Sequence, residues 1–512
     1  SKLFIIDVAL DKDKDNPQLI FESLNATGLA LSQADLIRNY ILMSRSPEEQ
    51  DELYNDYWHR MEQGFGQAEY SELFDRFMRD YLTIKTNNIP NIKEVYLAFK
   101  EYSSSKEIKE LVSDIYRYSK YYIKIALNKE EDEEIKNAFV DINDLKVDVS
   151  YPFILEVYSD YENKIIEKEE FVKILRFIES YVFRRAICGI PTNSLNKTFA
   201  TLYKEIDKQS YIESLMAALL LKDSYRRFPD DNEFLMELLV KDVYHFRNRN
   251  YLLRKLENND RKEIVNVETY TIEHIMPQNE NLSDQWKGEL GPNWREIHKK
   301  YLHTIGNLTL TGYNPELSDR SFKEKNKMKG GFSDSPIRLN RNLAQLDHWN
   351  EEEIVARAKE MSELACSVWI APKLDYLILK KYKKIETEEP SKVYTFKDHV
   401  HLTGDVRALF EELRKRVLNL DSSVKEEILK HYIAYKIDRN FLAIHAQKKN
   451  LKLWLGLNYD EINDPKKLCE DVEEKGHFGT GNVEFKIDSL KEIEDAMFLV
   501  RQAYKKRAEE EE

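Results

Sequence analysis

The residues best suited to chemistry are an adjacent glutamate and histidine, Glu273 and His274, inside the apolar stretch YTIEHIMPQN of residues 270–279. A histidine on an apolar strand is most often a core residue, so this pair indicates a site only if partners exist elsewhere in the chain. A neutral imidazole can accept a proton near pH 7, and carboxylate and amide oxygens suit a hard cation. Two amides follow in HTIGNLTLTGYN (303–314), at Asn307 and Asn314.

The order of these residues is a strand with the histidine, a hairpin with one asparagine, and a second asparagine before a lysine-rich helix start at 318–327. This order resembles the ββα-metal, or His-Me finger, domain of HNH endonucleases. The resemblance implies hydrolysis of phosphodiester bonds with Mg²⁺ or Mn²⁺, with His274 as the general base and Glu273 and Asn314 as metal ligands. Asn307 completes the catalytic set by tying the hairpin to the strand through its amide, which can both donate and accept hydrogen bonds.

Two features depart from a simple site of this kind. The last HNH position is Asn314 rather than a histidine, although an asparagine does that metal-binding job in some HNH domains. On a regular strand Glu273 and His274 point to opposite faces, so both reach one site only if the strand end is distorted. Pro277 is consistent with the strand ending there.

Positive charge gathers next to these motifs. Between Arg295 and Arg341 there are ten lysines and arginines against five acids, a net +5 in a chain whose formal charge is -14. Since phosphate contacts depend on local charge, we expect this basic window to face DNA. The nucleic-acid-binding residues expected near the helix start are Arg320, Lys323, Lys325 and Lys327, with Lys325 preferred.

Composition indicates a folded, helix-rich protein, with 42% hydrophobic and 33% charged residues and only 15 glycines and 13 prolines in 512 residues. The three cysteines are far apart and form no C-x-x-C motif, which argues against a disulfide framework or a local zinc ribbon and favours the cytoplasm. No apolar run approaches the roughly 18 residues of a membrane helix, so we expect no membrane partner.

Spacing of apolar residues predicts a mostly α chain with several domains. We expect a strand-helix remnant at 1–45, a helical bundle at 46–257, an α+β nuclease domain of ββα-metal (HNH) type at 258–372, a linker at 373–392 and a C-terminal α+β accessory domain at 393–512.

Particular residues are expected to serve packing or capping. Ser32 is placed to cap a helix, with Asp35 at the third helical position. After the nuclease motif, four large residues recur at helical spacing and are expected in the core, namely Trp349, Ile354, Arg357 and Trp369.

A wider resemblance involves two further segments. FESLNATGLALSQADLIRNYILM (21–43), which contains Asn25, resembles the end of the ParB/sulfiredoxin-like NTPase domain of GmrSD-type modification-dependent restriction enzymes. VFRRAICGIPTNSLNKTF (182–199), together with the Glu-His and G-N-L motifs, resembles their nuclease half, so that roughly the first 370 residues are covered. The D-G-Q-Q-R motif that precedes the first segment in that family is absent, so we expect a C-terminal portion of a longer protein, with NTP acting only through the missing domain.

The resulting prediction is a metal-dependent endonuclease that cleaves foreign DNA in a restriction system. The expected partner is double-stranded DNA, including base-modified phage DNA, and formation of a homo-oligomer is left open. One alternative is a catalytically silent module that binds nucleic acid or supports assembly. The other is an RNase effector, because the phosphodiester is common to both polymers.

Overall fold

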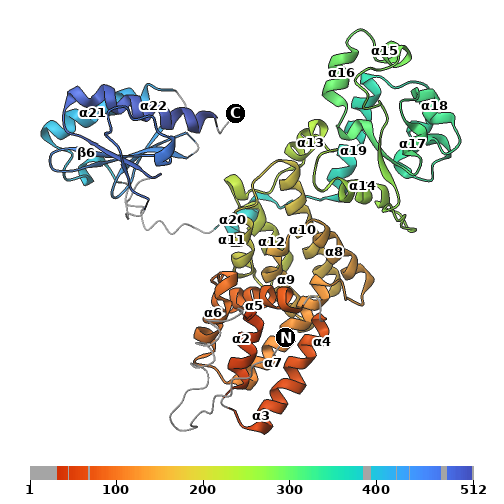
Figure 1. Cartoon of the computed structure of the whole chain (residues 1–512), viewed down its shortest axis with the longest axis horizontal. Coiled ribbons are helices and arrows are strands. Elements are labelled where there is room, and N and C mark those ends of the chain that lie inside the picture. Colours follow the sequence, from red (N-terminus) through yellow and green to blue (C-terminus); the bar gives the residue numbers. More distant parts are fainter. Residues whose placement is uncertain are drawn as a thin grey trace, which may run out of the picture. The chain divides into compact units, whose positions relative to one another are not determined.

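The computed structural model describes residues 31–43, 45–66, 70–383, 394–421, 424–437, 439–473 and 481–509. The chain divides into two compact units, Ser1–Lys383 and Lys384–Glu512, and the division falls within the segment expected to be a linker (Figure 1). Asn25 and most of the 1–45 segment lie outside the described residues, as do 384–392 of the expected linker and residue 393 after it.

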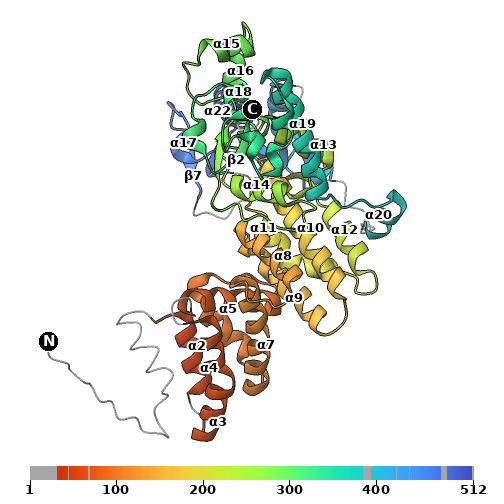
Figure 2. The same cartoon turned by 90° about the vertical axis from the view of Figure 1, so that its right-hand side faces the viewer.

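The first part of unit 1 is helical, as the spacing of apolar residues predicts. In α7, for example, the buried residues Leu111, Ile115, Tyr118 and Tyr122 follow one another at three- and four-residue spacing, which places them on one face. Figure 2 shows α7 beside α4 in the lower part of the unit. The helices of this part are α2 (Gln33–Leu42), α3 (Pro47–Glu52), α4 (His59–Phe65), α5 (Tyr70–Thr86), α6 (Val95–Ser103), α7 (Ile108–Ala126), α8 (Glu133–Asp144), α9 (Tyr151–Glu162), α10 (Lys168–Ile187), α11 (Leu195–Leu202), α12 (Tyr211–Leu220), α13 (Asp231–Val240) and α14 (Arg249–Asn258), with a π-helical turn at Leu53–Trp58.

The start of α2 confirms the expected cap. Ser32 Oγ accepts a hydrogen bond from the Asp35 backbone N–H at 3.1 Å and donates to the Asp35 carboxylate at 2.7 Å. The N–H groups of Gln33 and Ala34 donate to Asp75 of α5 at 3.2 and 2.7 Å. The exposed amides of the first turn are therefore satisfied by one local and one distant side chain, and α2 is fixed against α5.

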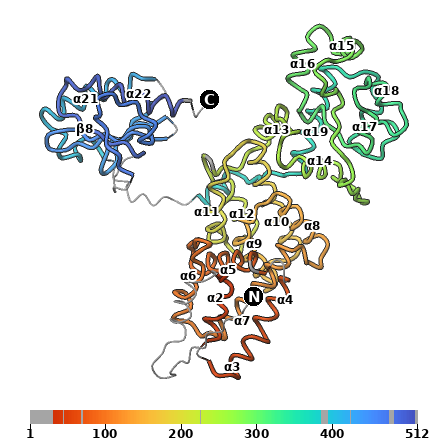
Figure 3. The backbone as a smooth tube through the Cα atoms, viewed as in Figure 1, coloured from red at the N-terminus to blue at the C-terminus, as the bar shows by residue number. Residues whose placement is uncertain are grey.

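The two arginines of the VFRRAI segment serve packing. Arg184 is fully buried in α10, where Nε donates to the Trp369 carbonyl and Nη2 pairs with Asp231 of α13, both at 2.6 Å. Arg185 is 2% exposed, and its Nη2 donates to the Pro191 carbonyl at 2.8 Å. These bonds join α10 to α13 and to the chain that follows α19 (Glu351–Val368), which lies beside α13 in Figure 3.

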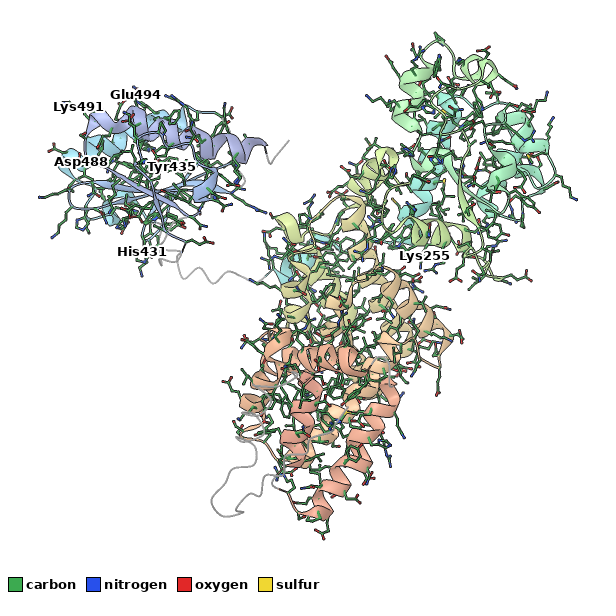
Figure 4. All side chains as sticks on the ribbon, in the orientation of Figure 1. Lys255, His431, Tyr435, Asp488, Lys491 and Glu494 are labelled. Carbon is green, nitrogen blue, oxygen red and sulfur yellow. The ribbon has the colours of Figure 1, made fainter. Side chains whose placement is uncertain are left out.

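A network of two buried carboxylates and three partly exposed cations connects α8, α10 and α14. Asp141 accepts from Arg176 at 2.5 Å, Arg254 at 2.7 Å and Lys255 at 2.8 Å, and Lys255 also pairs with Glu179 at 2.8 Å. Lys255 is labelled in Figure 4. These cations hold the pKa of Asp141 at about 2 although burial acts in the opposite direction.

The second part of unit 1 contains a small antiparallel sheet surrounded by short helices. Its strands are β1 (Thr271–His274) and β2 (Leu308–Thr311), and its helices are α15 (Asp284–Leu290), α16 (Trp294–Tyr301), α17 (Asn314–Leu317), α18 (Phe322–Lys327) and the longer α19. The following helix, α20 (Tyr376–Tyr382), instead contacts α12 of the bundle. Leu308 and Leu310 belong to the same hydrophobic core as the helical bundle, while Ile275, Met276 and Trp349 belong to a smaller separate core. The bundle and the segment 258–372 therefore form one compact unit.

Unit 2 has the expected α+β character. Its antiparallel sheet has the order β3-β4-β5-β6-β8-β7, and the residues of α21 and α22 pack with those of the central strands in one core. The elements are α21 (Gly404–Leu418), β3 (Lys425–Ile428), β4 (Ile433–Lys436), β5 (Asn440–Ala446), β6 (Leu451–Leu455), β7 (Glu470–Asp471), β8 (Val483–Ile487) and α22 (Ile493–Glu509). In the described residues of both units, no helix combines the length and apolarity that a bilayer span requires.

Candidate functional site

The strand with the Glu-His pair is short and pairs with the strand that follows Asn307. In the register of β1 and β2, Glu273 lies opposite Thr309 and His274 opposite Leu308. Pairing continues one step further, where the Ile275 N–H donates to the Asn307 carbonyl at 2.9 Å. The end of β1 is thereby held directly against the G-N-L turn.

Asn307 makes the connection that its amide suggested. Its Oδ1 accepts from the Met276 N–H at 2.7 Å and from Trp349 Nε1 at 3.2 Å. Its Nδ2 donates to the carbonyls of Met276 and Leu302, both at 3.0 Å. Since Asn307 is fully buried, this amide fixes the chain just after β1 from the inside.

Helix α19 supports the same turn. Arg357 is buried, and Nη1 donates to the carbonyls of Ile305, Gly306 and Leu308 at 2.9–3.0 Å. Burial lowers the pKa of Arg357 to about 10. A Cβ at Gly306 would lie 2.3 Å from the Ile354 carbonyl oxygen, so glycine permits this close approach. The expected core residues Trp349, Ile354, Arg357 and Trp369 are all buried.

The edge of β1 that faces away from β2 is covered by two residues from the later helices. Because antiparallel hydrogen bonds alternate along a strand, the carbonyls of Ile272 and His274 point to this edge. Asn314 Nδ2 donates to the Ile272 carbonyl at 2.8 Å, and Lys325 Nζ donates to the His274 carbonyl at 2.9 Å. Asn314 and Lys325 therefore both complete the backbone hydrogen bonding of β1.

Lys325 differs from the sequence expectation of a phosphate-binding surface residue. Its side chain is fully buried, and Nζ lies 2.5 Å from Oε1 of Glu273, which is 4% exposed. Lys325 lies on the buried side of α18 with Phe322 and Asn326, whereas Lys323 and Lys327 are exposed. Burial raises the pKa of Glu273 and lowers that of Lys325, and each charge opposes the shift of the other.

His274 lies on the opposite face of β1 from Glu273, as expected for a regular strand. It is 4% exposed, and Nε2 lies 3.1 Å from Nδ1 of His303. The ring of Tyr244 contacts His274 with centroids 4.5 Å apart and stacks on His303 at 5.2 Å. Burial, followed by the nearby His303 and Lys325, lowers the pKa of His274 to about 3, so its imidazole is neutral at pH 7.

A group of side chains of metal-ligating type lies on the His274 face. Asp242, His245 and His303 each offer one ligand atom, and these atoms lie within 4.8 Å of one another. His245 Nδ1 lies 2.9 Å from Oδ2 of Asp242. The rings of His245 and His303 are in edge-to-face contact at 4.7 Å.

Glu273 fits a divalent cation poorly in this arrangement. A cation on the Glu273 carboxylate would lie beside the buried Lys325 ammonium group, and like charges in a poorly solvated site repel strongly. Asn314 donates through Nδ2 to the Ile272 carbonyl, and this bond does not engage Oδ1, the atom through which an asparagine ligates a cation. The carboxylate of Glu273 is thus committed to an ion pair.

The basic window is largely on the surface. Arg320 is exposed, and its Nε donates to the Glu316 carbonyl at 2.9 Å. Within the window the exposed cations are Arg295, Lys299, Lys300, Arg320, Lys323, Lys327, Lys329 and Arg341. They come from α16, from the α17–α18 region and from the segment before α19, so the positive charge is not confined to one helix.

Sequence reasoning did not assign Asp242, Tyr244, His245 or His303 to the site. The signals were weak: an aspartate and a histidine three residues apart, and a histidine four residues before Asn307. Their significance depends on a contact between segments far apart in sequence, in which the N–H groups of Val243 and Tyr244 donate to the His303 carbonyl at 2.9 and 3.3 Å.

Comparisons with known proteins give family matches to one segment in each of the two compact units. Residues 391–506 match a domain of unknown function, DUF5655. An uncharacterized protein of Haemophilus influenzae is 38% identical over 136 residues, which are 26% of this chain and 45% of that protein. The chain thus spans less than half the length of this relative.

The remaining match covers the segment that contains β1, β2 and the His274 face. Residues 228–364 match the family model described as the C-terminal domain of GmrSD restriction endonucleases. The match begins at α13, before the expected domain start at 258, and includes neither 21–43 nor 182–199. Residues 228–364 of this chain are therefore a C-terminal domain of the GmrSD restriction endonuclease type.

Proposed function

We propose that residues 228–364 form an HNH-type endonuclease that hydrolyses phosphodiester bonds of foreign, base-modified double-stranded DNA with the help of a divalent metal ion. The family match supports a restriction nuclease. The observation that carries the assignment to particular residues is the position of His274, at the end of β1 with its ring held by His303 and Tyr244 and the following turn fixed by Asn307.

In the proposed reaction His274 takes a proton from a water molecule, whose oxygen attacks the phosphorus atom. The bond to the leaving 3′ oxygen breaks, and that oxygen takes up a proton from solvent. A divalent cation, when bound, neutralises charge on the phosphate and on the leaving oxygen. A base needs a fixed position relative to its water, and the contacts of His274 restrict the ring to one orientation.

Asn307 acts as a positioning residue in this scheme. It reaches His274 through the backbone, since it holds Met276 two residues later and its own carbonyl accepts from Ile275. The exposed cations of the basic window hold the phosphate backbone of the DNA, with Arg320, Lys323 and Lys327 closest in sequence to Asn314. Lys325 instead keeps Glu273 and the edge of β1 in place.

The test is cleavage by the purified full chain of plasmid DNA, base-modified phage DNA and RNA, with Mg²⁺, with Mn²⁺ and with EDTA. His274→Ala should lower the rate by roughly 10²–10⁴-fold, the usual cost of losing a positioned base. The matched control is His298→Ala, because His298 is also buried in this unit and its Nε2 contacts the Pro277 carbonyl at 2.9 Å.

The results distinguish a catalytic His274 from a structural one, and a DNA nuclease from an RNase or a silent binding module. If both variants lose similar thermal stability and only His274→Ala loses cleavage, the loss is chemical. Cleavage at the wild-type rate by a destabilised His274→Ala variant would contradict the proposal. Cleavage of RNA alone would indicate an RNase, and DNA binding without cleavage under any metal condition would indicate a silent binding module.

A further inference from the structure

We propose that Asp242, His245 and His303 bind a first-row transition metal ion on the His274 face of β1. A role for this ion in cleavage rests on the proposed nuclease function, whereas metal binding itself is inferred from the positions of the three side chains. Their ligand atoms lie within 4.8 Å of one another. Ligand distances near 2.0–2.2 Å place two ligands of one ion at most about 4.4 Å apart, so a single ion needs only a small closing movement of these side chains.

The donor set selects the class of metal. Two imidazoles and one carboxylate suit Mn²⁺, Co²⁺ or Zn²⁺, whereas Mg²⁺ and Ca²⁺ prefer sites made of oxygen. Nδ1 of His303 faces His274, so Nε2 of His303 is the ring nitrogen left to hold the ion. Three protein ligands leave coordination positions for water or a phosphate oxygen, which is typical of catalytic rather than structural sites.

The backbone holds the three side chains together. The N–H groups of Val243 and Tyr244 both donate to the His303 carbonyl, and the His245 N–H donates to Asp242 Oδ1 at 3.0 Å. The ring of Tyr244 also stacks on that of His303, with an interplanar angle of 15°, and so adds a side-chain contact to the backbone bonds between these two parts of the chain. Binding therefore needs little ordering of the chain, which lowers its entropic cost.

The location relates this site to His274. His303 contacts both the proposed ion, as its ligand, and the imidazole of His274 at 3.1 Å. Asp242 and His245 are exposed and His303 is partly exposed, so an ion here is reachable from solvent while His274 lies beneath it. On the other face of β1 the carboxylate of Glu273 faces a buried ammonium group, so the His274 face is the one that can accept a cation.

The experiment measures metal binding directly. The full chain is freed of metal with EDTA, dialysed, and titrated with Mn²⁺ and with Zn²⁺ by calorimetry at pH 7. We expect one site per chain, and weaker binding by at least ~10-fold in Asp242→Asn, His245→Gln and His303→Gln, since loss of even an outer partner typically costs 10–100-fold. Thermal unfolding of each variant without metal checks the fold.

Two controls use residues outside this cluster. His348→Gln removes an exposed histidine whose Nε2 lies 3.9 Å from Oε1 of Glu353, and it should leave the affinity unchanged. Asn314→Ala tests the metal ligand expected from the sequence at the edge of β1, and it should also leave the affinity unchanged. Loss of binding in Asn314→Ala with retained binding in the three cluster variants would overturn the proposal, as would absence of Mn²⁺ and Zn²⁺ binding to the wild-type chain.

Cleavage assays in parallel distinguish the two proposals. Metal-dependent cleavage that survives in all three cluster variants would contradict a role for this metal site in catalysis and leave the nuclease assignment intact. Metal binding that depends on the cluster, in a chain that cleaves no nucleic acid, would support this site and remove the nuclease assignment.

Discussion

Nζ of Lys325 lies 2.5 Å from Oε1 of Glu273, with the lysine side chain fully buried and the glutamate side chain 4% exposed. Charges removed from water in this way depend on each other, because either one alone would be a buried unpaired charge. Lys325 also donates to the His274 carbonyl at 2.9 Å, so the pair fixes the strand that carries the proposed base.

Removal of the lysine charge should therefore be costly. We expect Lys325→Met to lower the free energy of unfolding by about 3–5 kcal/mol, because Glu273 would remain buried without its partner. Denaturant unfolding monitored by circular dichroism measures this change. Lys323→Met is the matched control, since Lys323 lies in the same helix but is exposed, and it should change stability by less than about 0.5 kcal/mol.

A double variant separates pairing from other roles. Glu273→Gln with Lys325→Met removes both charges, and it should recover much of the stability lost in Lys325→Met, since replacing a whole buried pair is often close to neutral. A double variant as unstable as the sum of the two single variants would mean that the two side chains act independently.

Asn307 should matter for stability as well as for cleavage. Asn307→Ala removes hydrogen-bond partners from Met276, Leu302 and Trp349, all within a buried turn. Each buried group left without a partner costs about 1–3 kcal/mol, so we expect a loss of at least about 2 kcal/mol. Asn342→Ala is the control, because the exposed amide of Asn342 bonds only to Glu360, and its melting temperature should stay close to that of the wild type.

Local patterns predicted the elements around the site. The strand around His274, the Ser32 cap and the burial of Trp349 and Ile354 all depend on residues close in sequence, and the structure confirms each of them. Trp349, however, lies just before α19 rather than within it. Asn307 was assigned to the hairpin connection because its amide can donate and accept, and it does both. Such features follow from the geometry of nearby residues and from the need of buried polar groups to form hydrogen bonds.

The surroundings of Glu273 could not be predicted in this way. Lys325 follows Glu273 by 52 residues, and a run of alternating lysines gives no sign of which one turns inward. The same limit applies to His303 and His245, whose approach depends on how α14 and β2 pack in a common core. A cluster of lysines and arginines predicts a positively charged surface, but it does not identify which of these side chains is buried.

Glu156 should make the stability of the helical bundle depend on pH. Burial in α9 raises its pKa from the 4.5 of an ordinary glutamate to about 8, with Asp160 acting in the same direction and Lys85, Lys204 and Lys208 opposing it. Between pH 4.5 and about pH 8, Glu156 is therefore protonated more often in the folded state than in the unfolded state. The stability that Glu156 contributes is full below about pH 4.5 and is lost as the pH rises through 8.

Glu156→Gln tests this dependence. The variant cannot ionise at this position, so its free energy of unfolding should decline less than that of the wild type between pH 5 and pH 8.5. Glu162→Gln is the control, because Glu162 is exposed at the end of the same helix, and it should keep the wild-type slope. Equal slopes in Glu156→Gln and the wild type would show that Glu156 does not carry the effect.

The last prediction concerns the basic window as the DNA-facing surface. If its exposed cations contact phosphates, the logarithm of the DNA association constant should fall linearly with the logarithm of salt concentration, with a slope of about -0.9 per phosphate. Fluorescence anisotropy with a labelled duplex, in EDTA to prevent cleavage, measures this slope. Lys323→Glu with Lys327→Glu should weaken binding and reduce the slope by about 2, because two phosphate contacts are lost. The matched control reverses Lys93 and Lys197, two exposed lysines of the helical bundle that lie outside the window. It makes the same change in net charge, so an equal loss of affinity in both double variants would assign binding to overall charge rather than to this surface.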